Sequence, residues 1–235
     1  EPFGITISVG GEIGEVGKEN SNEQELKAYL DNFNELLEKA RSGATSISKI
    51  SIQTGTSHGG VPLPDGTVAE VDLDFDTLEN LSCISRESYG LAGAVQHGAS
   101  TLPQELFHKF PELETAEIHL ATDFQNMIYG SELFPSDFKE EIYTHLREKF
   151  ASEKKSDQTD EQFIYKTRKK GFGEFKSKFW GLSNEIREGI GKELETKMDF
   201  MFNKLAVQNT KEFVNKTVEL VPIQPKLQDE INACE

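Results

Sequence analysis

Two histidine–glycine pairs are the residues whose types and setting most directly suggest chemistry in this sequence. His58 lies in the stretch "QTGTSHGG" and His97 in "VQHGAST", and each histidine follows a short apolar run. A neutral imidazole is a common ligand of divalent metals. The glycine after each histidine has no Cβ, so the backbone and a bound anion can approach each other closely. The repeated pair therefore indicates a metal site with an anion beside it.

Further polar residues lie in or at the end of strand-like segments. Glu12 ends a strand-like segment in "GGEIGEVG", and His119 lies within another, "EIHLATD". Two histidines and a glutamate with an open position form a known type of catalytic zinc site. Ser100 and Thr122 could add hydroxyl donors, and the N–H groups of a tight turn can cradle a phosphate. Taken singly, a histidine at a strand end is more often structural, and a glutamate such as Glu12 is more often a solvated or paired surface group.

The elements that must position these residues alternate between strands and helices. Strand-like runs lie at 4–13, 46–54, 90–98 and 115–123. Helical patterns follow them at 20–40, 75–90, 102–110 and 135–151. Ser21 or Asn22 is the expected N-cap of the first helix, and the second helix should end at Gly90. Such alternation predicts a parallel sheet covered by helices, either a small open sheet or half of an eight-stranded barrel.

From residue 152 the composition changes. A charged segment at 152–162 precedes further helical patterns. Four aromatic residues there have the spacing of one packing face: Phe172, Phe175, Phe179 and Trp180. We therefore predict an α/β region at 1–151 and a helical extension at 152–235.

The overall composition limits the partners and the compartment. The chain has 41 acidic and 25 basic residues and a net charge of −16, which argues against binding nucleic acid or an anionic membrane. The two cysteines, Cys83 and Cys234, make no disulfide framework and favour a reducing cytoplasm. The sequence shows no signal peptide and no apolar run of about 20 residues. Because it opens without Met, almost directly on a strand-like run, we expect a piece of a longer polypeptide.

Four motifs, in this order and at this spacing, carry a family resemblance. The stretches "GEIGEVG", "TGTSHGG", "VQHGASTLP" and "IHLATD" resemble the C-terminal half of the class II fructose-bisphosphate aldolases, over residues 4–130. The resemblance implies the C-terminal half of a (β/α)8 TIM barrel and a catalytic Zn²⁺ or other divalent cation. It also implies cleavage of a ketose bisphosphate, such as fructose 1,6-bisphosphate to dihydroxyacetone phosphate and glyceraldehyde 3-phosphate.

The resemblance also assigns roles to individual residues. His58 and His97 match two zinc histidines of the family, and Glu12 matches a glutamate at or near the metal. The residues that match the groups holding a substrate phosphate are Gly59, Gly98, Ser100 and Thr122. The substrate implied is thus a phosphorylated sugar, and a homo-oligomer, a dimer or larger, is expected because aldolases of this type commonly form one.

Two positions match the family less well: the proton-transfer residue and the residue at the fourth strand. Glu19 or Asn20 falls where the family's mobile loop carries an acidic residue, and we take Glu19 as the catalytic candidate. His119 stands where the family usually has an asparagine that helps to hold the substrate, and it is the second catalytic candidate. The family's first zinc histidine and the neighbouring catalytic aspartate have no match here, so we expect the isolated chain to be inactive.

Two other functions remain open on the sequence. The chain could be a non-catalytic, aldolase-like subunit whose helical extension serves assembly. It could also belong to another metal-dependent barrel enzyme, such as a hydrolase, in which the histidines activate water.

Overall fold

The computed structural model describes residues 7–14, 19–40, 43–55, 62–64, 69, 73–222, 224 and 226. The chain divides into two compact units. The main unit spans Ser8–Ala206, and the terminal unit combines Glu1–Ile7 with Val207–Glu235. The terminal unit contains α10 (Lys211–Thr217), a short helix whose residues are exposed.

The described strands form one parallel sheet. They are β1 (Gly10–Glu12), β2 (Lys49–Ile52), β3 (Ala94–Gln96) and β4 (Glu117–Ile118). Their order across the sheet is β1-β2-β3-β4, and every neighbouring pair is parallel. The predicted parallel α/β arrangement is confirmed. Each connection leads to the next strand, so the carboxyl ends of all four strands lie along one edge of the sheet.

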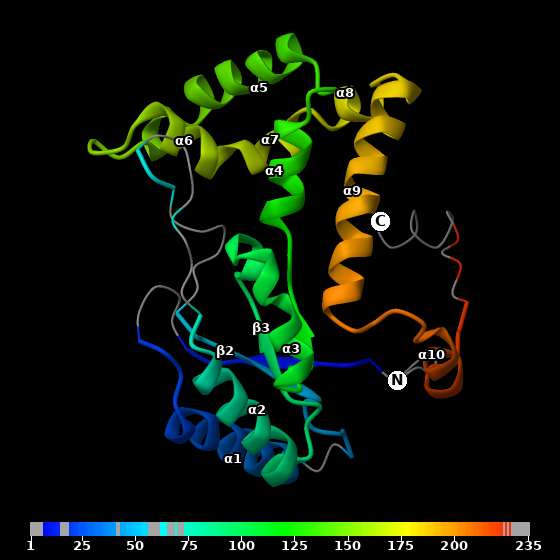
Figure 1. Ribbon diagram of the computed structural model, residues 1–235. Coiled ribbons are helices and arrows are strands. Elements are labelled where there is room, and N and C mark those ends of the chain that lie inside the picture. Colours follow the sequence, from blue (N-terminus) through cyan, green and yellow to red (C-terminus); the bar gives the residue numbers. More distant parts are fainter. Residues whose placement is uncertain are drawn as a thin grey trace. The chain divides into compact units, whose positions relative to one another are not determined.

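Helices fill the connections between the strands, as the sequence predicts. They are α1 (Glu23–Ala40), α2 (Phe75–Tyr89) and, between β3 and β4, the short helices η1 (Ala99–Thr101), η2 (Gln104–His108) and α3 (Lys109–Glu112). α1 and α2 lie together on one side of the strands (Figure 1).

The ends of the first two helices follow local sequence signals. Asn22 precedes α1, where its side chain accepts from the Glu25 N–H at 3.0 Å and Glu25 Oε2 accepts from the Asn22 N–H at 3.1 Å. This reciprocal pair is a capping box, and it confirms Asn22 rather than Ser21 as the cap. Gly90 ends α2 in the left-handed conformation, with φ 67°, which explains why a glycine stands there.

The two faces of the sheet have opposite chemistry. Ile50, Ile52 and Ala94 point toward the helices and belong to a buried cluster that also contains leucines of α1 and α2. We call this the first hydrophobic cluster. Side chains alternate along a strand, so Lys49 and Ser51 must point to the other face of the sheet. The apolar face packs against α1 and α2, so polar side chains of the strands lie on the opposite face.

One predicted element is wrong. The sequence suggested a single strand over 115–123, but β4 ends at Ile118 and α4 (Thr122–Gly130) follows at once. Helical winding brings Tyr129, which is 1% exposed, into a second hydrophobic cluster. This long-range burial decides the conformation, and a local pattern cannot show it.

Helices make up the rest of the main unit. They are α5 (Ser136–Lys149), η3 (Ala151–Glu153), α6 (Asp160–Thr167), η4 (Arg168–Lys170), α7 (Gly171–Glu174), α8 (Lys176–Trp180) and α9 (Asn184–Lys204). The second hydrophobic cluster joins Ile142 of α5, Phe163 of α6 and Ile190 of α9. This cluster takes residues from both sides of 151, and the division of the chain there stays a prediction.

The aromatic packing face is confirmed for three of its four members. Phe172, Phe175 and Phe179 pack against the second hydrophobic cluster. The rings of Phe172 and Phe179 stack with centroids 4.9 Å apart. Trp180 was wrongly included, because its side chain is 68% exposed.

Helix α9 connects the two hydrophobic clusters. Ile190 lies in the second cluster, and Met201 lies in the first with 2% exposure. Within the described ranges, no helix combines the length and the apolar character needed to cross a membrane.

Asp74 provides a test of the α2 cap. Its carboxylate accepts from the Thr77 N–H at 2.9 Å and from the Thr77 hydroxyl at 2.7 Å, and these bonds lower the pKa of Asp74 from its ordinary value of 3.8. Asp74→Ala should reduce the free energy of unfolding at pH 7 by about 1 kcal/mol. A lowered folded-state pKa gives stability above the unfolded value that is lost as pH falls through the folded one. The difference between wild type and Asp74→Ala should therefore shrink below a pH of about 4.

Urea unfolding from pH 7 down to pH 3 measures this difference. Asp74→Asn is the matched variant, because an amide caps a helix well but does not titrate. Its advantage over Asp74→Ala should not depend on pH. If the difference in free energy of unfolding between wild type and Asp74→Ala were also independent of pH, the ionised carboxylate would not have the assigned role.

Candidate functional site

The strand register lines up polar residues near the carboxyl edge of the sheet. Glu12 pairs with Ser51, Ser51 with Val95, and Val95 with Glu117, so the four residues form one row across the strands. This row lies on the face of the sheet opposite α1 and α2, because it alternates with the row that contains Ile50. We call this the polar face.

His97 and His119 come together at the carboxyl edge. Each directly follows the last residue of its strand, and the His119 N–H donates to the Gln96 carbonyl at 2.9 Å, which continues the parallel ladder. Their ring centroids are 4.3 Å apart and their planes meet at 42°. The structure thus places two imidazoles, from neighbouring strands, side by side on the polar face.

Glu117 links this histidine pair to the neighbouring strands. One of its carboxylate oxygens contacts His119 Nε2, and the other accepts from Lys49 Nζ. Because β3 lies between β2 and β4, the bond between Glu117 and Lys49 crosses β3. The hydrogen bond with His119 and then the one with Lys49 lower the pKa of Glu117.

The ionised Glu117 fixes the orientation of His119. A carboxylate only accepts hydrogen bonds, so the nitrogen facing it must carry a proton. In neutral His119 the proton is therefore on Nε2, and Nδ1 is the acceptor. A carboxylate behind a histidine is also the usual way to fix the tautomer of a metal-binding or catalytic imidazole.

The predicted phosphate residues after β3 and β4 also converge. Gly98 is buried and has φ 72°, a left-handed conformation that favours glycine. Ser100 Oγ accepts from the Ala121 N–H at 3.1 Å, and α4 begins at the next residue, Thr122. Its N-cap residue, Ala121, makes no side-chain cap hydrogen bond. The two loops therefore meet at a helix N-terminus, where N–H groups and the helix dipole favour an anion.

Of the two predicted acidic residues, Glu12 lies away from the histidine pair across the sheet, and Glu19 lies outside the strands. Glu12 ends β1, which β2 separates from β3, so the backbones of β1 and β3 are about 10 Å apart. Glu19 is exposed and precedes Ser21, whose N–H donates to the Gln53 carbonyl at 2.8 Å. This bond holds Ser21, just before α1, against the residue that follows β2 at the carboxyl edge.

The predicted His58 and Gly59 lie outside the described residues. In the described part of the chain, no three His, Cys, Asp or Glu side chains gather as a metal-binding group. Two adjacent imidazoles are nevertheless the kind of donor that zinc accepts. The donor chemistry of His97 therefore fits a zinc ion, for which His58 and Glu12 are the other predicted ligands.

Sequence reasoning missed several charged residues around this site. Glu117 and His119 are two residues apart on one strand, so strand alternation alone could have placed them on one face. Lys49 on β2 could have been found the same way. Lys197, which pairs with Asp123 at the start of α4, gave no local signal, because the two lie far apart in the sequence.

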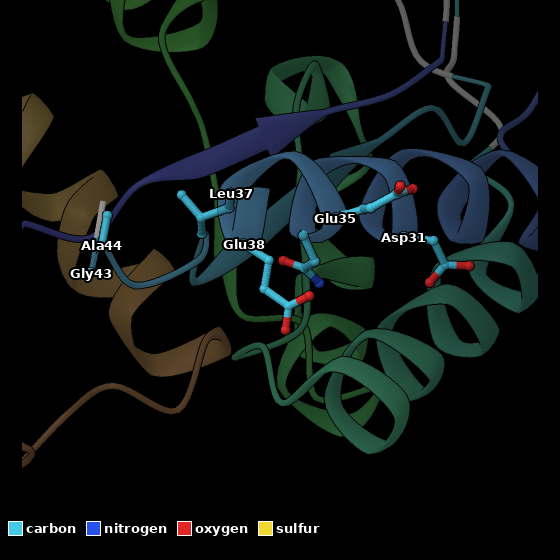
Figure 2. Close-up of a pocket in the computed structure, with 7 residues that line it drawn as sticks. Asp31, Glu35, Leu37, Glu38, Gly43 and Ala44 are labelled. Carbon is cyan, nitrogen blue, oxygen red and sulfur yellow. The ribbon is translucent and has the colours of Figure 1, made fainter. Parts of the chain in front are cut away.

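A cavity of about 610 Å³ lies elsewhere, beside the last turns of α1 (Figure 2). Asp31, Glu35 and Glu38 line it together with the segment that leads into the amino end of β2. Two of these acids already have partners, since Asp31 accepts from the Tyr89 hydroxyl at 2.9 Å and Glu35 pairs with Lys39. None of the predicted site residues that the structure describes lines this cavity.

The sequence matches the family model described as "Fructose-bisphosphate aldolase class-II" over residues 4–204. No curated protein matches the chain. The chain belongs to the class II fructose-bisphosphate aldolase family, as the motifs predicted. Membership indicates an aldolase, a lyase of carbohydrate metabolism, from a family that is generally zinc-dependent.

The pKa of Glu117 tests the charge network of the polar face. Lys49→Met removes one of the two hydrogen bonds that stabilise the carboxylate, so the pKa of Glu117 should rise toward its ordinary value of 4.5. It should stay below that value, because the stronger contribution, from His119, remains. Carbon-13 NMR of glutamate-labelled protein would follow the titration.

Lys27→Met is the matched control, because Lys27 forms an exposed pair with Glu23 on α1. It should leave Glu117 unchanged. An identical pKa of Glu117 in wild type and Lys49→Met would show that the bond across β3 contributes nothing in solution.

Proposed function

We propose that the protein catalyses metal-dependent aldol cleavage and condensation of a ketose bisphosphate, with fructose 1,6-bisphosphate as the first substrate to test. The observation that carries this proposal is the convergence at the carboxyl edge of the sheet. There the His97 and His119 rings lie 4.3 Å apart, and Ser100 joins the loop after β3 to the start of α4. Family membership supplies the reaction class.

The fold proposal is the C-terminal half of a (β/α)8 barrel. A sheet whose spatial order follows its chain order, with helices on one face, has the connectivity of such a barrel. Its other face would then be the barrel interior. Lys49, Ser51 and Glu117 on that face suit the polar interior of an active site, and β1 and β4 would pair with the remaining strands.

His97 and His58 would hold the metal, with Glu12 at or near it. Bound there, a divalent cation would act as a Lewis acid and stabilise the negative charge that develops during cleavage. Gly98, Ser100 and Thr122, with Gly59, would bind a substrate phosphate through backbone N–H and hydroxyl groups. Fixing the phosphate fixes the carbon chain relative to the reacting bond.

The two catalytic candidates have separate roles. His119, oriented by Glu117 through its Nε2, would hold a substrate oxygen with its ring beside His97. Glu19, on the loop tied to the carboxyl edge through Ser21, would transfer the proton. The helical extension, a cytoplasmic location and assembly into a homo-oligomer complete the proposal.

Aldol cleavage by the full-length protein tests the function. We expect cleavage of fructose 1,6-bisphosphate that is lost with EDTA and restored by Zn²⁺. His97→Ala should lower kcat/KM by at least about a hundredfold and reduce bound zinc, because it removes a predicted ligand. The matched control is His108→Ala, on η2, where Nδ1 bonds only to the local Glu105 carbonyl.

The outcomes separate the candidate functions. A folded, zinc-loaded protein that cleaves no ketose bisphosphate would exclude the proposed reaction. It would leave the non-catalytic aldolase-like subunit as the interpretation. Full activity in His97→Ala would instead show that the metal assignment is wrong.

A further inference from the structure

We infer that Lys197 of α9 is a positioning residue for the substrate phosphate, because it neutralises Asp123 at the start of α4. The inference deepens the proposed function and rests on it, since it concerns the phosphate site at Gly98, Ser100 and Thr122. It gives the helical extension a part in substrate binding that acts through Asp123.

The position of Lys197 on its helix is unusual for a lysine. Ile190, Leu194, Lys197 and Met201 recur at the spacing of one helix face. The three apolar members all contact the hydrophobic clusters. The Lys197 side chain on this inward face is only 11% exposed, although lysine is almost never buried unless it is paired.

The partner of Lys197 is an acid at the phosphate site. Lys197 Nζ lies 2.6 Å from Asp123 Oδ2. Asp123 is in the first turn of α4 and directly follows Thr122. The helices α4 and α9 lie side by side (Figure 1). The helical extension thus delivers a positive charge to the segment that, by the proposed function, receives the phosphate.

The charge balance gives this contact a consequence for binding. The predicted phosphate residues, Gly59, Gly98, Ser100 and Thr122, include no cation, and the chain carries a net charge of −16. An uncompensated Asp123 carboxylate within one helical turn of a phosphate dianion would repel it. Lys197 cancels this repulsion while the N–H groups of α4 remain available to the anion.

A purely structural salt bridge would behave differently. If Lys197 and Asp123 only tied α9 to α4, removing either residue or both would loosen the helices to a similar degree. If the pair instead controls the charge beside the phosphate, removing Lys197 alone should weaken phosphate binding, and removing both charges should not. The double variant therefore separates the two roles.

The experiment measures phosphate affinity and kinetics in the full-length protein. Inorganic phosphate and fructose 1,6-bisphosphate are titrated by calorimetry in the presence of EDTA, and KM and kcat are determined with Zn²⁺. Lys197→Met should weaken binding and raise KM by about tenfold, with kcat changed much less, because one nearby unit charge is left uncompensated. Asp123→Asn/Lys197→Met should recover most of the loss.

Two further variants keep the result interpretable. Lys197→Arg retains the charge and should keep near-normal affinity, and thermal unfolding of every variant checks that it is folded. Lys192→Met is the matched control, because Lys192 is an exposed lysine on the same helix. It should change neither binding nor KM.

Each outcome decides the inference independently of the aldolase reaction. Affinity that is unchanged in Lys197→Met, or is not restored in the double variant, would overturn it even if the protein is an active aldolase. Wild-type protein that binds neither phosphate nor the bisphosphate would also overturn it. Calorimetry could show weaker binding in Lys197→Met and recovery in the double variant while no cleavage is detected. In that case the inference stands and the proposed reaction fails.

Discussion

The hydrogen-bond register of the parallel sheet is the constraint on which the rest of the structure depends. Because β2, β3 and β4 run parallel and in chain order, the residue after each strand reaches the same edge. His97 and His119 meet there although a whole strand–helix connection separates them in the sequence. A shift of one residue in either strand would turn its histidine toward α1 and α2, where Ile52 and Ala94 pack. The aliphatic residues buried against the helices therefore hold the imidazoles in place.

Several charges around the candidate site are paired. Glu117 lies between Lys49 and His119, and Asp123 is matched by Lys197 from α9. The chain has a net charge of −16, but interactions between exposed charges are screened over about 10 Å. For the binding of an anion, these local pairs therefore matter more than the net charge. An acidic protein can then hold an anionic substrate wherever cations are fixed beside its own carboxylates.

The helices after α4 share packing with the region that carries the site. The second hydrophobic cluster includes Tyr129 of α4 as well as Phe163 and Ile190. Helix α9 also reaches the first hydrophobic cluster through Met201. The end of α4 away from the site is thereby held by aromatic packing, while its start meets Ser100. This arrangement explains how sequence changes in the helical part could affect the strand ends without touching them.

The sequence by itself determined the alternation of strands and helices, the start of the first helix near Ser21 or Asn22 and the end of the second at Gly90, because these depend on periodicity and on local backbone chemistry. It also placed His97, Gly98, Ser100 and His119 at strand ends, where their motifs indicated the aldolase family. The tertiary structure alone decided that 122–130 winds into a helix, since Tyr129 gains its burial from distant residues. It alone brought Lys49 to Glu117 and Lys197 to Asp123. Contacts between residues far apart in the chain follow from packing and register, which no local pattern encodes.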